Sequence, residues 1–394
     1  MEIIIFNKTK ELYKSIDVSK MLRKISVTNG FSRSFTYDGD LFDESIIELK
    51  ALKNINLSVL SDSLLNFLYD KKRLGLDDEA LEKCLEKWLS SFKLTEYICI
   101  YPINNVSFKG KVSYLDGFVE LSKYSENIDF FVEKLQTNER KNFFVGDNFI
   151  TLKVKGYSKD DAKEISINLA HYISYIYNIS IFLEYNVCAD VHIGYDSEKY
   201  MWDGLVIQNE DQNNLLYFDS NKNIIIPAHV KKLCINNSVF NSLMKLLHKY
   251  SNQEQMSNVE KYVLLSLGLL GKAIELKNRN YSFVMAMSSI ESLLELENEG
   301  HIKRNISRRC ARIISNEDNF NDNVYKIRSL YEIRSNISHG EVVYISERKL
   351  KEIIRISIYV LFYFVIESPR IEHDYGNADF HKHIDDILPK KDTL

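Results

Sequence analysis

The residues best suited by type and spacing to carry chemistry lie in the stretch 331–340. It contains Arg334 and, five positions later, His339. An imidazole exchanges protons near neutral pH, and a guanidinium offers a fixed fork of hydrogen-bond donors to an oxyanion. These two side chains are therefore the first candidates for a functional site.

The helical phase of this stretch places Arg334 on an apolar stripe. Ile327, Leu330 and Ile337 share that stripe, at spacings of three and four residues. Burying a guanidinium is costly unless it is paired or lies at a polar seam. We therefore expect Arg334 either to be paired or to lie at a polar seam.

His339 lies about 140° around a regular helix from Arg334. The two side chains do not converge on one straight helix. A site that uses both could form where the helix end bends beside Gly340, or where a second copy packs across a two-fold axis. The simpler interpretation, two cations near the negative end of a helix dipole, also stays open.

This stretch resembles the HEPN superfamily, and within it the Apea-like HEPN group. The signature is an arginine, a polar residue, three variable residues and a histidine, which Arg334 to His339 match. Tyr331 and Gly340 complete the Apea-like form, whereas Ser335 stands where the wider superfamily more often has Asn, Asp or His.

Two preceding segments extend the resemblance to roughly residues 250–367. Residues 283–295 resemble the helix that carries a glutamate, Glu291, ahead of a leucine pair. Residues 306–314 resemble the arginine-rich helix that follows it.

The resemblance implies a metal-independent endoribonuclease without a cofactor. In such enzymes the RNA 2′-hydroxyl attacks the adjacent phosphate, giving a 2′,3′-cyclic phosphate and a 5′-hydroxyl. On this interpretation His339 is the general acid or base and Arg334 binds the phosphate. Asn336 or Ser338 would bind substrate or orient His339, and Glu291 would hold Arg334 in place.

The resemblance also implies partners and a biological role. The substrate would be RNA, such as tRNA, and the protein would be a homodimer or higher homo-oligomer with both motifs in one cleft. It would serve as a toxin or antiphage defence effector, with a phage-derived trigger or an inhibitory partner protein. The alternative is a non-catalytic HEPN-like module for binding or dimerisation that senses RNA, a nucleotide or a partner protein.

Charge is distributed unevenly along the chain. The total is 51 Lys and Arg against 55 Asp and Glu, a net charge of −4, which argues against unselective nucleic-acid coating. Residues 301–355 hold 12 Lys and Arg against 7 Asp and Glu, a net charge of +5. Arg304, Arg308 and Arg312 share one helical face there, which suits either an RNA backbone or solvent. The residues expected to contact RNA are Arg304, Arg308, Arg309, Arg312, Tyr331, Ser335 and Ser338.

No metal site is expected. His373, His381 and His383 are suitable residue types, but their spacing gives no clear geometry. The five cysteines are scattered, without a C-x-x-C pair, which argues against a zinc site or a disulfide framework. Together with the lack of a signal peptide, this predicts a cytoplasmic protein that contacts no membrane.

The composition favours long helices, since the 394 residues include 14 Gly and 4 Pro. We expect a mainly helical region over residues 1–95, after a short strand-like start, with helices at 57–69 and 77–92. Residues 96–238 are predicted to form an α+β domain, for sensing, regulation or substrate positioning. It contains a helix at 158–177 between strands at 149–154 and 179–185. Further strands are expected at 96–101, ending at Pro102, at 215–218 and at 224–226.

From residue 239 the pattern is helical. Helices are predicted at 239–250, 257–277, 281–297, 302–315, 319–339 and 346–367, with Gly300 and Gly340 as C-terminal capping glycines. The apolar run 353–366 is too short to span a bilayer and predicts a buried helix. Residues 369–394 are expected to form a loosely packed extension. The fold class is thus α+β: a mixed α/β region followed by an all-α, HEPN-like bundle over 239–368.

Overall fold

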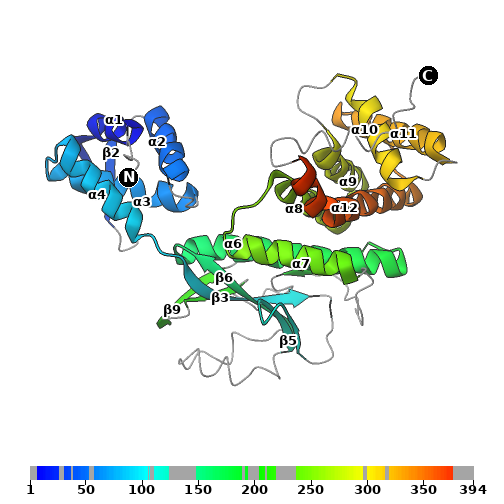
Figure 1. The fold of residues 1–394 in the computed structure, drawn as a ribbon, viewed down its shortest axis with the longest axis horizontal. Helices are drawn as coiled ribbons and strands as arrows, with labels where there is room; N and C mark the ends of the chain where they lie inside the picture. The colour runs from blue at the N-terminus through cyan, green and yellow to red at the C-terminus, as the bar shows by residue number, and fades with distance from the viewer. Residues whose placement is uncertain are drawn as a thin grey trace. The chain divides into compact units, whose positions relative to one another are not determined.

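The chain is α+β and divides into two compact units (Figure 1). The computed structural model describes residues 7–25, 31–36, 39–52, 57–104, 106, 111–123, 148–188, 191–193, 204–208, 211–218, 237–295, 300–315 and 319–375. The first unit comprises Met1–Glu96 with Lys155–Lys163, and the second comprises Tyr97–Val154 with Glu164–Leu394. The predicted regions 96–238 and 239–368 thus fall almost entirely in the second unit.

The first unit is mainly helical, as predicted. The two expected helices are present, and Asp77 caps the second by accepting a hydrogen bond from the Ala80 amide at 2.8 Å. A pair of antiparallel strands was not predicted, and the strand-like start lies outside the described residues. The elements are α1 (Asn7–Ser15), β1 (Asp17–Ile25), β2 (Phe31–Thr36), α2 (Gly39–Leu52), α3 (Leu57–Arg73) and α4 (Asp78–Ser91).

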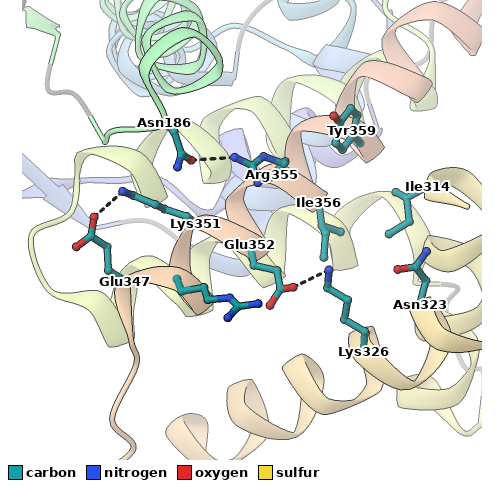
Figure 2. A pocket seen from close by; sticks show the side chains of 11 residues that line it. Asn186, Ile314, Asn323, Lys326, Glu347, Lys351, Glu352, Arg355, Ile356 and Tyr359 are labelled. Carbon is teal, nitrogen blue, oxygen red and sulfur yellow. Dashed lines mark hydrogen bonds and ion pairs between the residues drawn. The ribbon is translucent and has the colours of Figure 1, made fainter. Parts of the chain in front are cut away.

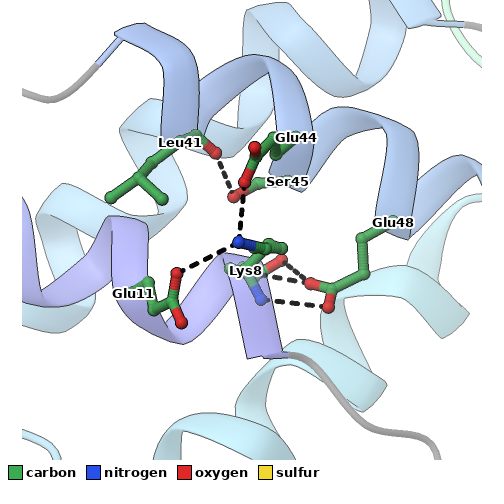
Figure 3. A network of polar contacts seen from close by, with 7 residues as sticks. Lys8, Glu11, Leu41, Glu44, Ser45 and Glu48 are labelled. Atoms are coloured by element: carbon green, nitrogen blue, oxygen red, sulfur yellow. Dashed lines mark hydrogen bonds and ion pairs between the residues drawn. The ribbon is translucent and has the colours of Figure 1, made fainter.

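A glutamate of α2 caps the N-terminus of α1 (Figure 3). Glu48 accepts hydrogen bonds from the amides of Lys8 and Thr9, at 3.0 and 2.9 Å, and from the Thr9 hydroxyl at 2.8 Å. The amides of a first helical turn have no partner within the helix, and that end of the helix carries partial positive charge. The Lys8 ammonium pairs with Glu44 at 2.8 Å in a half-exposed position. Glu48 therefore fixes α1 to α2.

We predict that Glu48→Gln lowers the free energy of unfolding of the first unit by about 1–2 kcal/mol. The glutamine side chain carries no charge, and its NH2 group directs a donor at backbone amides that need an acceptor. The measurement is urea unfolding followed by Trp88 fluorescence in a Trp202→Phe background, because the chain has two tryptophans. Glu44→Gln is the matched control and should cause no measurable change, since its ion pair is exposed. Equal losses for both variants would contradict the capping role.

The second unit contains a seven-stranded sheet in the order β4-β5-β6-β3-β8-β9, with the short strand β7 paired to β3. β6 contains the predicted strand 149–154, and β9 contains 215–218. The strand predicted to end at Pro102 instead continues to Asn104, and 224–226 lies outside the described residues. The strands are β3 (Thr95–Asn104), β4 (Val112–Tyr114), β5 (Val119–Lys123), β6 (Asn148–Gly156), β7 (His192–Ile193), β8 (Gly204–Gln208) and β9 (Asp211–Phe218).

Helix α6 (Lys159–Tyr185) packs on this sheet, and the Tyr101 hydroxyl of β3 lies 2.6 Å from that of Ser166 (Figure 1). Its predicted N-terminus is confirmed, because Ser158 accepts a hydrogen bond from the Asp161 amide at 3.1 Å. The predicted strand at 179–185 is wrong, since the helix continues through it. Residues 173–182 are all buried, so the helix shows no amphipathic period there. A short apolar run without a period looks the same in a buried strand.

All six helices predicted after residue 239 are confirmed, with ends that differ by a few residues. Ser257 and Glu260 form a capping box at the start of the second. Within the part of the chain that the structure describes, no helix is long and apolar enough to cross a membrane. The helices are α7 (Asn237–Ser251), α8 (Asn258–Glu275), α9 (Arg279–Leu294), α10 (Ile302–Ile314), α11 (Phe320–Ser338) and α12 (Glu347–Tyr375).

Two predictions about helix ends differ from the structure. Gly300 does not cap a helix in the left-handed conformation, because α9 already ends at Leu294 and Gly300 stands two positions before the start of α10. The expected loose extension is helical over 369–375, since α12 continues through Pro369, and its remainder, 376–394, lies outside the described residues. Ile371 is fully buried there and Glu372 accepts a hydrogen bond from Ser257. These contacts hold the last turns of α12.

Two glycines of α8 allow it to cross α6 closely. Gly268 faces Tyr172, and Gly271 faces Tyr175, so residues three apart on one helix meet residues three apart on the other. A Cβ at 268 would contact the Tyr172 ring at an ordinary 3.5 Å, whereas a Cβ at 271 would overlap three Tyr175 atoms. The close approach of α8 to α6 therefore depends on Gly271.

We predict that Gly271→Ala lowers the melting temperature of the full chain, with a loss of about 1–3 kcal/mol. The added methyl group must displace a buried tyrosine ring. Gly268→Ala is the matched control and should be neutral or stabilising, because alanine favours a helix over glycine by about 1 kcal/mol. Thermal unfolding followed by circular dichroism compares the two, and an unchanged melting temperature for Gly271→Ala would exclude the close crossing.

Candidate functional site

Helix α11 positions the Arg–His motif at its C-terminal end. It packs against α9 and α10 through Ile327 and Leu330, which are buried. Arg334 lies on the same stripe one turn later, with 29% of its side chain exposed. The predicted placement of Arg334 on the apolar face is confirmed, and the guanidinium lies at the edge of the core.

Arg334 is paired with Glu291 of α9. Its Nη2 donates to Oε2 of Glu291 at 3.0 Å, and Glu291 is 7% exposed. The Tyr331 ring centroid lies 5.9 Å from Arg334 Cζ, and the Tyr331 side chain lowers the pKa of Glu291. Three of the residues singled out from the sequence thus form one cluster between α9 and α11.

Burial dominates the electrostatics of this cluster. It raises the pKa of Glu291 above its usual value, although the charge and hydrogen bond of Arg334 partly oppose the shift. It also raises the pKa of Tyr331, and the Glu291 charge acts in the same direction. Oε1 of Glu291 and Nε of Arg334 are buried, with no hydrogen-bond partner among the described residues. Among the described residues, one hydrogen-bonded ion pair therefore joins Arg334 to the buried Glu291 carboxylate.

His339 is the residue at which α11 ends, and Gly340 fixes its backbone. Gly340 has φ +85°, and its amide donates to the Ile337 carbonyl at 3.0 Å. The Glu341 amide donates to the Asn336 carbonyl at 3.0 Å. These two bonds form a Schellman motif, so the predicted capping role of Gly340 is confirmed. The His339 side chain is exposed, with no hydrogen bond or ion pair to any described residue.

The small polar residues of the motif surround this helix end. Asn336 and Ser338 are exposed, and Ser335 is partly buried. Because α11 is regular up to Ser338, Arg334 and His339 stay about 140° apart around the helix. The structure thus brings Arg334 to Glu291, and leaves the His339 side chain without a partner among the described residues at the helix end.

The arginines of α10 divide into two groups. Arg304 is exposed, while Arg308 and Arg312 are partly buried, and Arg312 Cζ lies 4.7 Å from the centroid of the Phe320 ring. These three follow one face, as the spacing predicts. Arg312 is partly engaged by that ring, so Arg304 is the most accessible of the row.

Arg309 lies away from the expected RNA-binding surface. It is 5% exposed, and its Nη1 donates to the Leu294 carbonyl at 2.9 Å. That carbonyl belongs to the last turn of α9, where backbone acceptors lack partners within the helix. Arg309 therefore ties α10 to the end of α9.

Sequence reasoning missed the apolar surface that follows the motif. Val342 and Tyr344 stand two positions apart in the segment after Gly340, and both side chains are almost fully exposed. Their signal in the sequence is an apolar pair directly after a predicted helix end. They place hydrophobic surface near His339 in the chain.

Comparison with known proteins adds no assignment: no family model, no curated protein and no solved structure matches this chain. The functional interpretation therefore depends on the motif and on its surroundings in the bundle.

We predict that Arg334→Ala destabilises the protein more at pH 8 than at pH 5, by about 1–2 kcal/mol. Without Arg334 the pKa of Glu291 rises further, so the folded state holds its proton more tightly than the unfolded state. The loss in free energy of unfolding is then small at pH values near the pKa of Glu291 in the unfolded chain. It grows as the pH rises towards the pKa of Glu291 in the folded variant.

Unfolding by urea at both pH values measures this difference. Arg328→Ala, an exposed arginine on the same helix, should show none. Adding Glu291→Gln to Arg334→Ala should remove this pH dependence, because the Glu291 carboxylate is then absent. A pH-independent loss in the single variant would show that Glu291 does not carry the effect.

Proposed function

We propose that this chain is a metal-independent endoribonuclease of the HEPN type. His339 moves a proton at the reacting oxygens, and Arg334 binds the scissile phosphate. One observation carries the proposal: a buried carboxylate holds a partly exposed guanidinium at 3.0 Å, and an exposed histidine follows it at the same helix end.

The arrangement leaves donor groups for a phosphate. Glu291 engages Nη2 of Arg334, and a guanidinium has five N–H donors, so others remain for substrate oxygens. Glu291 restricts the orientation of the fork before substrate arrives, which reduces the entropy lost on binding. His339 has no competing partner among the described residues, and its imidazole is available for proton transfer.

The proposed reaction balances without an added reactant. A base takes the proton of the 2′-hydroxyl, and the 2′-oxygen forms a bond to phosphorus. The bond from phosphorus to the 5′-oxygen breaks, and an acid supplies a proton to that oxygen. The products are a 2′,3′-cyclic phosphate and a 5′-hydroxyl, and Arg334 offsets the negative charge that develops on the phosphate oxygens.

The helix geometry favours a site made by two copies. On one helix Arg334 and His339 point about 140° apart, whereas two helix ends facing each other can present both residues to one phosphate. A second imidazole would then supply the second proton-transfer group. The protein is therefore proposed to act as a homodimer or higher homo-oligomer, and Val342 and Tyr344 offer exposed apolar surface for that contact.

The RNA, such as tRNA, is proposed to run along the polar and basic residues around the motif. The biological role proposed is that of a toxin or antiphage effector, controlled by a trigger or an inhibitory partner. The residues proposed to contact the RNA are Arg304, Arg308, Arg312, Tyr331, Ser335, Asn336 and Ser338.

A non-catalytic binding module is the second candidate, and a specific observation favours it. The contact of Arg334 with Glu291 joins α11 to α9 and gives the arginine a structural role. In that case loss of stability is the only effect of Arg334→Ala, and the purified wild-type protein has no ribonuclease activity.

We predict that the purified protein cleaves RNA in EDTA and leaves 2′,3′-cyclic phosphate ends. His339→Ala and Arg334→Ala should each lower the cleavage rate by about 10³-fold, the scale of a lost acid–base or charge-stabilising group. Initial rates on total RNA and on tRNA, with end-group analysis, provide the measurement.

His373→Ala and Arg328→Ala are the matched controls, since both residues are exposed on the bundle outside the motif. Undiminished cleavage by both motif variants would refute the site assignment. Sequencing RNA ends after inducing wild type and His339→Ala in cells identifies the substrate.

A further inference from the structure

Helices α10 and α11 pack side by side as an antiparallel pair (Figure 1). At the end where α10 stops and α11 starts, Nδ2 of Asn323 donates to the Ser315 hydroxyl at 2.8 Å. At the other end, the Lys303 ammonium of α10 contacts the Glu332 carboxylate of α11. The start of α10 therefore lies beside the end of α11 that carries the motif.

His301 stands at this end of the pair, directly before α10. It precedes Lys303 by two residues, and in an antiparallel pair this places it within about one turn of the level of Arg334. His339 follows Arg334 by five residues, which is about 8 Å along the helix axis. The two imidazoles therefore belong to the same end of the pair.

The side of α11 that Lys303 contacts is also the side that carries His339. Ser335, Asn336 and His339 follow Glu332 by three, four and seven residues, and residues at these spacings share one helical face. This face thus presents small polar side chains between the level of His301 and the imidazole of His339. It is the part of the motif that the start of α10 adjoins.

The backbone of His301 has a conformation that few residues with a Cβ adopt. It is left-handed, with φ 57° and ψ 38°. Its carbonyl accepts hydrogen bonds from the Arg304 and Asn305 amides, and the Asn305 side chain donates to the Gly300 carbonyl at 3.0 Å. A glycine would adopt this conformation without steric cost. Backbone strain of this kind is concentrated at functional sites.

The side chain of His301 has no structural task among the described residues. It is exposed, it makes no capping hydrogen bond to α10, and it has no ion pair with any described residue. Among the charged groups on the neighbouring turns, Lys303 and Glu332 pair with each other, and Arg304 is exposed. Neither packing nor capping therefore explains an imidazole at this strained position.

We infer that His301 is a second proton-transfer group beside His339 of the same chain, an inference that rests on the proposed function. One neutral imidazole takes the proton of the 2′-hydroxyl as the 2′-oxygen bonds to phosphorus. The other, protonated, gives its proton to the 5′-oxygen as the bond from that oxygen to phosphorus breaks. The two rings exchange protonation states, and no further reactant is consumed.

The spacing of the two histidines suits this reaction. A separation of about 8 Å along the helix axis leaves room for a phosphate between two rings that each hydrogen-bond it at about 2.8 Å. Arg334 lies about 140° from His339 around α11, so a phosphate between the rings meets the arginine of a second copy. In the proposed homodimer each chain then supplies both imidazoles.

RNA cleavage by His301→Gly in EDTA, measured from pH 5 to pH 9, tests this role. Glycine favours the left-handed backbone, so the melting temperature should not fall. The rate at the optimum should fall about 100-fold or more, and one limb of the pH profile should disappear, as expected for a lost acid–base group. His301→Asn, which also tolerates this backbone, should lose the same activity.

Gln253→Gly is the matched control, because Gln253 is also left-handed, with φ 54°, and lies outside the motif. It should leave the cleavage rate and the pH profile unchanged. A third measurement uses cells that express His301→Gly and His339→Ala together. If each phosphate needs both imidazoles of one chain, the mixed protein contains no intact site and its activity is not restored.

Three results would overturn the assignment: undiminished cleavage by His301→Gly, a lower rate that keeps both limbs of the pH profile, or activity restored in the mixed protein. The last result would place the two imidazoles in different chains. An inactive His339→Ala beside a fully active His301→Gly would leave the proposed function standing. A wild-type protein that cleaves no RNA would refute the proposed function and the role of His301 together.

Discussion

A carboxylate inside a helical bundle is stable only if a cation accompanies it, and Glu291 imposes that constraint here. Taking the carboxylate out of water costs several kcal/mol, and a partner removed from such a pair leaves the remaining charge uncompensated. Arg334 is the partner, at 3.0 Å. Arg334, which is proposed to bind the phosphate, therefore also stabilises the buried carboxylate of Glu291. The position of Arg334 is set when the protein folds. A site that must be preorganised gains from this coupling, since the guanidinium does not need to be ordered when substrate binds.

His339 is positioned in a different way, by the backbone alone. The two bonds of the Schellman motif involve main-chain groups, and Gly340 supplies the left-handed conformation that they require. A Cβ at Gly340 would meet nothing, so the glycine is needed for its conformation and not for space. The side chain of His339 is left exposed and unengaged among the described residues. Arg334 is thus held rigidly by its side chain, while the imidazole can turn towards a substrate.

The sequence predicts many of the helices well because the helix ends carry local signals. The capping box at Ser257 and Glu260, the cap at Asp77 and the glycine at 340 each act within one turn. The errors occur where tertiary contacts decide. The strand predicted at 179–185 is the end of α6, which is buried on every side over residues 173–182, and α12 continues past Pro369 to a segment where Ile371 is buried. The same limit applies to the site. Periodicity placed Arg334 on the buried stripe and set Arg309 apart from the row of Arg304, Arg308 and Arg312, but it could not show that Arg309 binds a backbone carbonyl.

The same helix, α11, contributes to both charged features of the second unit. Lys326 lines a cavity between α10, α11, α12 and the end of α6 (Figure 2), and Arg334 lies eight residues later, which is about 12 Å along a helix. The two features differ in how their charge is balanced. Arg334 is paired with a buried carboxylate, whereas Arg348 and Arg355 of the cavity lining have no ion pair with any described residue.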